Sequence, residues 1–313
     1  MVNIAFVFPG QGSQFVGMGK EFFDSRAEAR GMFDEANEVL GKDLKSICFE
    51  GPEETLTLTE NTQPAILVHS IIALKILRGH DIDCVLAAGH SLGEFSALVA
   101  AGALSFRDAV RLVSLRGRFM QEAVPIGVGA MAAIIGLPVE KITELCEKAT
   151  KDGQLVQPAN LNSPEQTVIA GHKGAVEQVS QEAKESGAKR AVMLPVSAPF
   201  HCPLMKPAEI KLQQELEKTE FLDLSFPVIT NVEAKPNLKG DAAKLALRHQ
   251  VCSPVRWAET MKAMAEQGIQ TVIELGPGKV LSGLMKRFDK NIKCYQVHDS
   301  ASLEQTVTAL KQG

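Results

Sequence analysis

One turn in the sequence constrains the fold more than any other feature. Residues 84–88 form a short apolar run with the length of a buried strand, and residues 92–100 place apolar side chains at the spacing of a helix. The segment between them reads Gly89-His90-Ser91-Leu92-Gly93, so a serine stands where a strand passes directly into a helix. A turn this sharp favours glycine, because a Cβ restricts the backbone angles. The sequence therefore predicts a strand-turn-helix unit with Ser91 at the turn.

Ser91 fits the G-x-S-x-G pattern, which is typical of a nucleophilic serine presented on such a turn. The positive end of the helix dipole beside Ser91 favours a developing oxyanion. The same position also suits a serine that only caps the helix. The strand and the helix on its two sides favour the nucleophile over the cap.

Composition narrows the class of protein. A chain of 313 residues with 45% hydrophobic and 22% charged residues can bury a large core and form more than one folding unit. A formal charge of −4, with one Trp and one Tyr, gives no basic aromatic surface, so we expect no nucleic-acid partner. No apolar run has the length of a membrane span and the N-terminus lacks a signal-peptide pattern, so we expect no membrane association. Six cysteines without metal-ligand spacing predict reduced thiols in the cytoplasm and no metal site.

Strand and helix patterns alternate through most of the chain. This alternation predicts an α/β fold whose large domain has a mainly parallel sheet with helices on both faces, a hydrolase-like core. The strand patterns lie at residues 3–8, 84–88, 226–230, 271–274 and 293–297, and the clearest early helical patterns lie at residues 18–40 and 64–79.

The pattern changes after Pro125 to strand, helix, strand, strand, helix, strand. This order is the signature of a ferredoxin-like unit. We therefore predict that residues 126–197 form an inserted small ferredoxin-like α+β domain. Residues 1–125 and 198–313 would form the large catalytic domain.

A nucleophilic serine needs an adjacent base, most often histidine. His201 stands out among seven histidines, because prolines flank it in VSAPFHCPLM and the predicted insertion rejoins the large domain there, a usual place for a cleft. His298 is the rival, because an α/β-hydrolase places its histidine late in the chain. An HGGG-like oxyanion loop of that class is absent from the sequence.

Arg116 is a second anomaly, because it lies in the middle of the apolar stripe of a helical pattern at residues 107–123. Burying an unpaired guanidinium is costly, so an anionic partner is expected. An internal Asp or Glu is one candidate. The carboxylate of a substrate is the other, since arginine binds carboxylates through two parallel hydrogen bonds.

Six segments occur together and in order: FPGQGSQ, TQPA, GHSLGE, RLVSLRG, VSAPFH and LGPGKVLSG. In these motifs the chain resembles, over nearly its whole length, the discrete malonyl-CoA:acyl-carrier-protein transacylases of fatty acid synthesis. The resemblance implies that Ser91 is the acylated nucleophile, that His201 is its base and later its acid, and that Arg116 binds the malonyl carboxylate.

The same resemblance implies supporting residues. Backbone amides of Gln11 and Leu92 would form the oxyanion hole, a carbonyl near Gln250 would orient His201, and Asn160 of the small domain would face the cleft. The implied reaction moves a malonyl group from malonyl-CoA to the phosphopantetheine thiol of holo acyl carrier protein by a ping-pong route. It requires no cofactor or metal, and a monomer is expected.

Two other classes of function stay open on the sequence. A serine esterase or thioesterase of the α/β-hydrolase type shares the Ser91 turn but would release the acyl group to water. A non-enzymatic module that binds carrier protein would need Ser91 only as a helix cap. The width of the acyl pocket, and whether the pathway makes fatty acids or polyketides, are also open.

Overall fold

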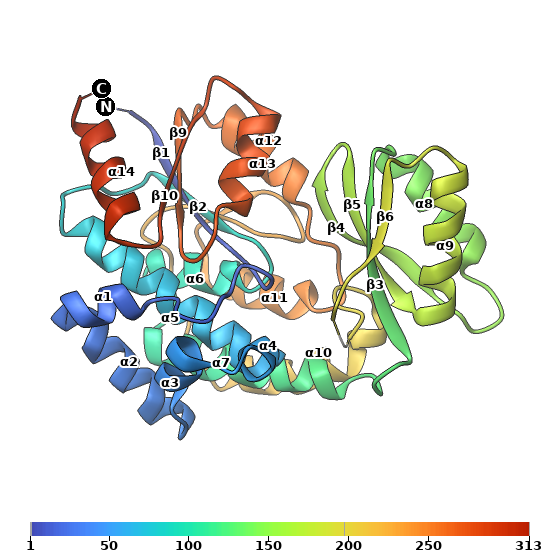
Figure 1. Cartoon of the computed structure of the whole chain (residues 1–313), viewed down its shortest axis with the longest axis horizontal. Coiled ribbons are helices and arrows are strands. Elements are labelled where there is room, and N and C mark those ends of the chain that lie inside the picture. Colours follow the sequence, from blue (N-terminus) through green and yellow to red (C-terminus); the bar gives the residue numbers. More distant parts are fainter. Residues whose placement is uncertain (1, 197, 313) are drawn as a thin grey trace.

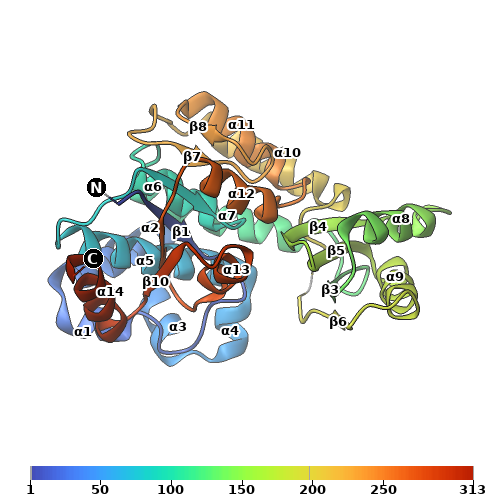
Figure 2. The same cartoon turned by 90° about the horizontal axis from the view of Figure 1, so that it is seen from above.

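The computed structural model describes residues 2–196 and 198–312, so that Ser197 of the VSAPFH motif and the two terminal residues of the predicted domains lie outside the described residues. Two bodies lie side by side, a large one that holds both chain ends and a small one coloured green to yellow (Figure 1). The view from above shows the same separation, with both ends on the side away from the small body (Figure 2).

The large body is built on a six-stranded sheet of order β10-β9-β1-β2-β7-β8. All neighbouring strands are parallel except β7 and β8, which confirms the predicted mainly parallel sheet. The strands are β1 (Ile4–Phe8), β2 (Leu86–Gly89), β7 (Val228–Ile229), β8 (Pro236–Asn237), β9 (Thr271–Leu275) and β10 (Lys293–Val297).

Helices cover both faces of this sheet. Alternate residues of β1 show the two sides, because Phe6 and Phe8 lie in one hydrophobic cluster and Ala5 and Val7 in another. The second cluster is closed by α12 (Trp257–Glu266) and α13 (Val280–Phe288). The other helices of this body are α1 (Lys20–Ser25), α2 (Ala27–Leu40), α3 (Leu44–Glu50), α4 (Glu53–Thr57), α5 (Thr59–Arg78), α6 (Gly93–Ala100), α7 (Phe106–Glu122), a 3-10 turn (Pro203–Met205), α10 (Lys206–Glu217), α11 (Gly240–Gln250) and α14 (Ser300–Gln312).

The small body is an antiparallel four-stranded sheet of order β4-β5-β3-β6, packed against two helices. With the chain order β-α-β-β-α-β, this is the ferredoxin-like fold that the sequence predicts. The elements are β3 (Gly129–Ile135), α8 (Val139–Ala149), β4 (Val156–Ser163), β5 (Gln166–His172), α9 (Lys173–Glu185) and β6 (Arg190–Met193). The domain boundaries themselves stay predictions.

Strand β4 ties the small body to the large one. Asn160 forms a parallel bridge with Val255, the residue two before α12. Val255 donates its N–H to the Ala159 carbonyl at 2.9 Å and accepts from Leu161 N–H at 2.9 Å. Asn160 is therefore held where the two bodies meet.

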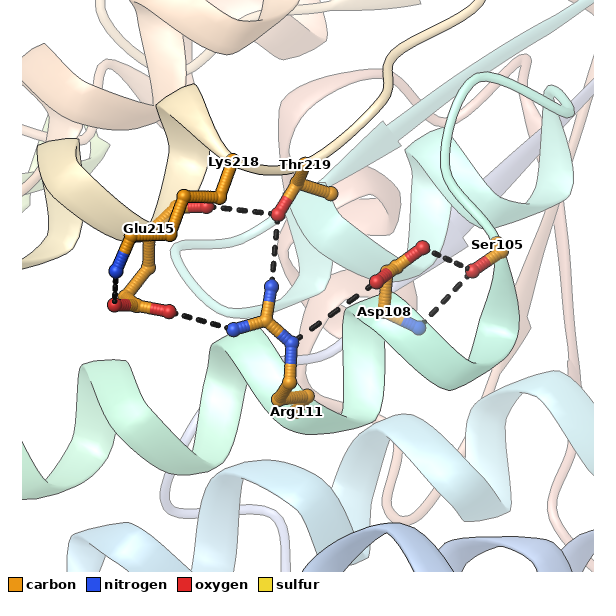
Figure 3. Close-up of polar contacts among 6 residues, drawn as sticks. All are labelled: Ser105, Asp108, Arg111, Glu215, Lys218 and Thr219. Atoms are coloured by element: carbon orange, nitrogen blue, oxygen red, sulfur yellow. Dashed lines mark hydrogen bonds and ion pairs between the residues drawn. The ribbon is translucent and has the colours of Figure 1, made fainter.

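Helix α7, which carries Arg116, is anchored at the surface. Ser105 caps its start by accepting from Asp108 N–H at 3.0 Å. Arg111 reaches Glu215 of α10 at 2.6 Å and the Thr219 hydroxyl at 2.9 Å (Figure 3). The contacts of Arg111 fix α7 against α10.

Two helical patterns differ from their predicted extents. The pattern at 18–40 divides into α1 and α2, because Arg26 takes an extended backbone at φ −129°. The pattern at 64–79 begins earlier, at Thr59, with Pro64 inside α5. Pro64 has no N–H for the Glu60 carbonyl, and that carbonyl instead accepts from Lys42 Nζ and Ser114 Oγ, each at 3.4 Å. Tertiary donors thus allow the helix to run through a proline.

We predict that Gly117→Ala destabilises the fold. A Cβ at Gly117 would lie 2.5 Å from the Thr59 carbonyl oxygen, so α7 would have to move away from α5. We expect a loss of about 1–3 kcal/mol in the free energy of unfolding, measured by chemical denaturation. Gly31→Ala is the matched control, because Gly31 is exposed in α2 with no atom within 4 Å of the added Cβ, and it should stabilise by up to about 1 kcal/mol. Equal changes in the free energy of unfolding for the two variants would contradict a tight crossing of α5 and α7 at Gly117.

Candidate active site

Ser91 lies between the end of β2 and the start of α6, in a strained turn. Its φ is 52°, in the left-handed region that few residues other than glycine adopt. A Cβ on Gly89 would lie 1.9 Å from the Gly93 carbonyl carbon, and one on Gly93 would lie 2.1 Å from Phe8 O. Both glycines are therefore required by close backbone packing. Among the described residues, the Ser91 hydroxyl hydrogen-bonds to His201 and Arg116 and to no backbone N–H of α6.

Asn231, just after β7, holds this turn from outside. Its side-chain oxygen accepts from Ser91 N–H at 2.7 Å, and its amide donates to the Gly89 carbonyl at 2.7 Å. Asn231 is fully buried. Backbone strain at a functional turn persists only where surrounding contacts maintain it, and Asn231 supplies two of them.

His201 is the histidine that reaches Ser91. The Ser91 hydroxyl lies 2.7 Å from His201 Nε2. His201 Nδ1 lies 2.8 Å from the Gln250 carbonyl oxygen, which can only accept, so Nδ1 carries the proton and Nε2 is left as an acceptor. His298, the predicted rival, contacts Asp299 at 3.3 Å and accepts at its carbonyl from His69.

Arg116 is buried and points at the same hydroxyl. Its Nη2 donates to Ser91 Oγ at 3.0 Å and to Gln250 Oε1 at 2.9 Å, and its Nη1 donates to Gln63 Oε1 at 2.8 Å. Within residues 2–196 and 198–312, no carboxylate oxygen lies within 4.0 Å of the guanidinium, and its buried Nε has no hydrogen-bond partner. The internal salt bridge that the sequence left open is therefore not formed.

These side chains surround a small cavity of about 100 Å³. A pocket of this small size suits a short acyl group. Its walls are formed by Gln11, Gln63, His90, Ser91, Leu92, Arg116, Met120, Met131, Asn160, Leu194, Val196, Phe200 and His201.

The structure brings all seven predicted site residues together. Six of them line the cavity, and Gln250 contacts Ser91, Arg116 and His201 from behind it. In the described part of the chain, the Gln11 and Leu92 amide N–H groups have no hydrogen-bond acceptor, as oxyanion donors would require. The roles of these residues stay predictions.

Sequence reasoning missed four residues that the structure places at the site. Gln63 and Glu94 lie within motifs that carry the family resemblance, TQPA and GHSLGE, but were given no role. Asn231 and Gln157 had no signal at all, because each acts on a residue distant in the chain. Gln157 Nε2, for example, donates to the His201 carbonyl at 3.0 Å.

Burial shifts the ionisation of the site. It lowers the pKa of Arg116 to about 10, which still leaves the guanidinium charged at neutral pH. Burial, together with the Arg116 charge, lowers the pKa of His201 to about 3, so the imidazole is neutral and able to accept a proton from Ser91. Burial raises the pKa of Glu94 to about 7, against the hydrogen bonds from Asn231 and Gln250.

In the part of the chain that the structure covers, no group of three or more His, Cys, Asp or Glu side chains is arranged to hold a metal ion. Among its helices, none combines the length and hydropathy of a membrane span.

Comparisons with known proteins agree over the full chain. A family model described as an acyl transferase domain matches residues 5–306. A malonyl CoA-acyl carrier protein transacylase of Bacillus subtilis is 50% identical over 312 residues, which cover 100% of this chain and 98% of that protein. The solved malonyl CoA-acyl carrier protein transacylase of Coxiella burnetii has a TM-score of 0.96 and 44% identity, with 99% of this chain and 98% of that one covered. A malonyl-transacylase solved in complex with its type II PKS acyl-carrier protein has a TM-score of 0.95 and 47% identity, covering 99% and 100%.

We predict that His201 stays neutral down to about pH 4. Its folded pKa, about 3, lies below the ordinary value of 6.5, so between these values the folded protein binds fewer protons than the unfolded chain. Stability from this residue is therefore present above pH 6.5 and is lost as the pH falls toward 3. NMR titration of ring-labelled histidine should show no titration of His201 between pH 5 and 8, and Arg116→Ala should move its pKa upward. A wild-type His201 that titrates near pH 6.5 would contradict this.

Proposed function

The chain belongs to the acyl transferase family, and we propose that it transfers a malonyl group from malonyl-CoA to the phosphopantetheine thiol of acyl carrier protein. One observation carries the mechanism: Ser91 Oγ lies between His201 Nε2 at 2.7 Å and Arg116 Nη2 at 3.0 Å, at the wall of a cavity of about 100 Å³. A nucleophile, its base and a cation for the acyl carboxylate thus converge on one small volume.

In the first half-reaction Ser91 Oγ attacks the thioester carbonyl carbon, and its proton passes to His201 Nε2. The negative charge that develops on the carbonyl oxygen accepts hydrogen bonds from the Gln11 and Leu92 amides. The carbon–sulfur bond then breaks, and His201 returns the proton to the departing coenzyme A sulfur. A malonyl-serine ester remains on Ser91.

In the second half-reaction the carrier thiol gives its proton to His201 and attacks the ester carbonyl. The bond to Ser91 Oγ breaks, and His201 returns the proton to that oxygen. Atoms and charges balance over the two steps, and they involve neither a metal nor a redox cofactor. Water competes with the carrier thiol, so transfer requires that the site positions the thiol at the ester better than it positions water.

Arg116 links specificity to catalysis in this proposal. At rest its charge disfavours protonation of His201 and its Nη2 occupies a lone pair of Ser91 Oγ. A malonyl carboxylate that binds the guanidinium offsets the Arg116 charge, so the pKa of His201 rises and the imidazolium forms more easily. The carboxylate also competes with Ser91 Oγ for the Arg116 Nη2 hydrogen bond. An acetyl group does none of these, so discrimination is expected in the rate of acylation.

We further propose that the protein is a cytoplasmic monomer that needs no cofactor and binds no nucleic acid. A hydrolase would use the same Ser91 and His201. The two activities differ in whether the malonyl-serine ester is lost to water or to the carrier thiol.

We predict that brief incubation with malonyl-CoA adds one malonyl group, on the peptide that contains Ser91. Intact-protein and peptide mass spectrometry measure it, and holo acyl carrier protein should remove the group. Ser91→Ala should abolish the adduct, because the nucleophile is gone. An adduct lost to buffer as fast as to the carrier would identify a hydrolase, and a malonylated Ser91→Ala protein would overturn the assignment of Ser91.

We predict that Arg116→Ala lowers malonyl transfer to Ser91 by about 10²- to 10³-fold, because one partner of a buried carboxylate-guanidinium pair is lost. Acetyl transfer should change by less than about tenfold, since acetyl offers no carboxylate. Rapid-quench acylation with each donor measures both rates. Arg111→Ala is the control on the same helix, because the hydrogen bonds and ion pairs of Arg111 with described residues go to Asp108, Glu215 and Thr219, none of them a site residue. Its ratio of malonyl to acetyl rates should equal that of the wild type. Equal losses for both donors in Arg116→Ala would contradict a carboxylate role.

A further inference from the structure

Glu94 is a buried carboxylate that the proposed mechanism does not use. It lies in the first turn of α6, three residues after Ser91, and is 1% exposed. Its Oε2 accepts from Gln250 Nε2 at 2.7 Å and from Asn231 N–H at 3.0 Å, whereas its buried Oε1 has no partner among the described residues. Burying a carboxylate with one oxygen unsatisfied is unfavourable, so packing alone does not account for it.

Gln250 connects Glu94 to Arg116. The Gln250 amide oxygen accepts from Arg116 Nη2 at 2.9 Å, and its amide nitrogen donates to Glu94 at 2.7 Å and to the Ser91 carbonyl at 3.0 Å. A rotation of the amide by 180° would turn its nitrogen to the guanidinium and its oxygen to the carboxylate. The guanidinium and the carboxyl group therefore fix the orientation of Gln250, whose amide bridges Arg116 and Glu94.

Asn231 forms the second connection. Its backbone N–H binds Glu94, and its side chain binds the Ser91 N–H and the Gly89 carbonyl. Glu94 thus supports the strained Ser91 turn through Asn231. Glu94 also binds the side chain of Gln250, and the backbone carbonyl of Gln250 orients His201. Among the described residues, the hydrogen bonds of Ser91, His201 and Arg116 thus connect through Gln250 and Asn231 to a single carboxyl group, that of Glu94.

The bridge has a chemical consequence for Arg116. A carboxylate in direct contact would occupy the guanidinium and exclude a substrate carboxylate. Glu94, one amide away, supplies a negative charge in its ionised form, which a pKa of about 7 leaves partly populated at neutral pH. It also leaves Arg116 Nε without a protein partner in the described chain. Countercharge and substrate recognition are thereby separated.

We propose that Glu94 is a positioning residue of the acyl-transfer site, which acts through Gln250 and Asn231 to hold Ser91, His201 and Arg116 in reactive geometry. This inference rests on the proposed function only for the identity of the acyl donor. The reactivity of Ser91 itself can be measured without malonyl-CoA, by the rate at which a fluorophosphonate probe labels the serine.

We predict that Glu94→Gln, which keeps the volume but removes the charge, slows both malonylation and fluorophosphonate labelling of Ser91 by about tenfold, since a charge-assisted hydrogen bond is about twice as strong as a neutral one. Gln250→Ala should slow labelling as well. In the Gln250→Ala background, Glu94→Gln should then cost less than it does in the wild type, about threefold, because the connection through Gln250 is already lost and only the one through Asn231 remains. Multiplicative losses in the double variant, or wild-type labelling in Glu94→Gln, would overturn the proposal.

The matched control is Glu274→Gln. Glu274 is an equally buried carboxylate, but it binds Leu281 N–H and Ser282 at the start of α13, away from Ser91. Its variant should lose stability yet label at a rate within about twofold of the wild type. If Glu274→Gln labelled as slowly as Glu94→Gln, general destabilisation would explain both rates, and a positioning role for Glu94 would be overturned.

A charge swap tests the bridge if Glu94→Gln alone folds poorly. Gln250→Glu places two carboxylates at hydrogen-bond distance and should slow labelling at least about tenfold. Adding Glu94→Gln to it restores an amide-carboxylate contact, so labelling should recover, while direct contact between Arg116 and the carboxylate introduced at position 250 should abolish the preference for malonyl over acetyl. A swapped protein no faster than Gln250→Glu would overturn the proposal. Failure of malonyl-CoA to acylate a wild type that reacts with the probe would instead refute the proposed function.

Discussion

The buried charge of Arg116 is the constraint on which the rest of the site depends. A guanidinium removed from water needs acceptors for its hydrogen bonds, and it finds them in Gln63 of α5, Gln250 of α11 and the hydroxyl of Ser91. Three elements far apart in sequence must therefore pack within hydrogen-bond distance of one side chain. The close crossing of α5 and α7, for which Gly117 leaves room beside Thr59, follows from the same requirement.

The choice of partner for His201 follows from this charge. A carboxylate at Nδ1 would stabilise the imidazolium, but it would also stand close to Arg116 and compete with a substrate carboxylate. The Gln250 carbonyl fixes the tautomer of His201 without adding a charge. The cost is a weaker base, since burial and Arg116 both lower the pKa of the ring. In the mechanism proposed here the substrate itself reduces that cost, because its carboxylate offsets Arg116 at the moment when His201 must accept a proton.

Features encoded in contiguous residues could be predicted from the sequence. The turn at Ser91 combines a strand, two glycines and a helix within a few residues, and the order of strands and helices identified the ferredoxin-like fold. Contacts made by tertiary structure could not be predicted in this way. Asn231 follows the strand predicted at residues 226–230, but its contact with Ser91 spans 140 positions, and no local pattern indicates it. Pro64 was expected to start a helix, and only the side chains of Lys42 and Ser114, brought to the Glu60 carbonyl by folding, explain why it does not.

The small body is part of the site and not an appendage to it. Asn160, Met131 and Leu194 complete the wall of the cavity, and Gln157 of β4 holds the backbone of His201. Because β4 also pairs with Val255, a movement of the small body relative to the large one would change the shape of the cavity and the position of the base together. The insertion therefore supplies one wall of a site whose Ser91 and His201 would by themselves also suit hydrolysis, and transfer depends on how that wall positions the carrier thiol relative to water.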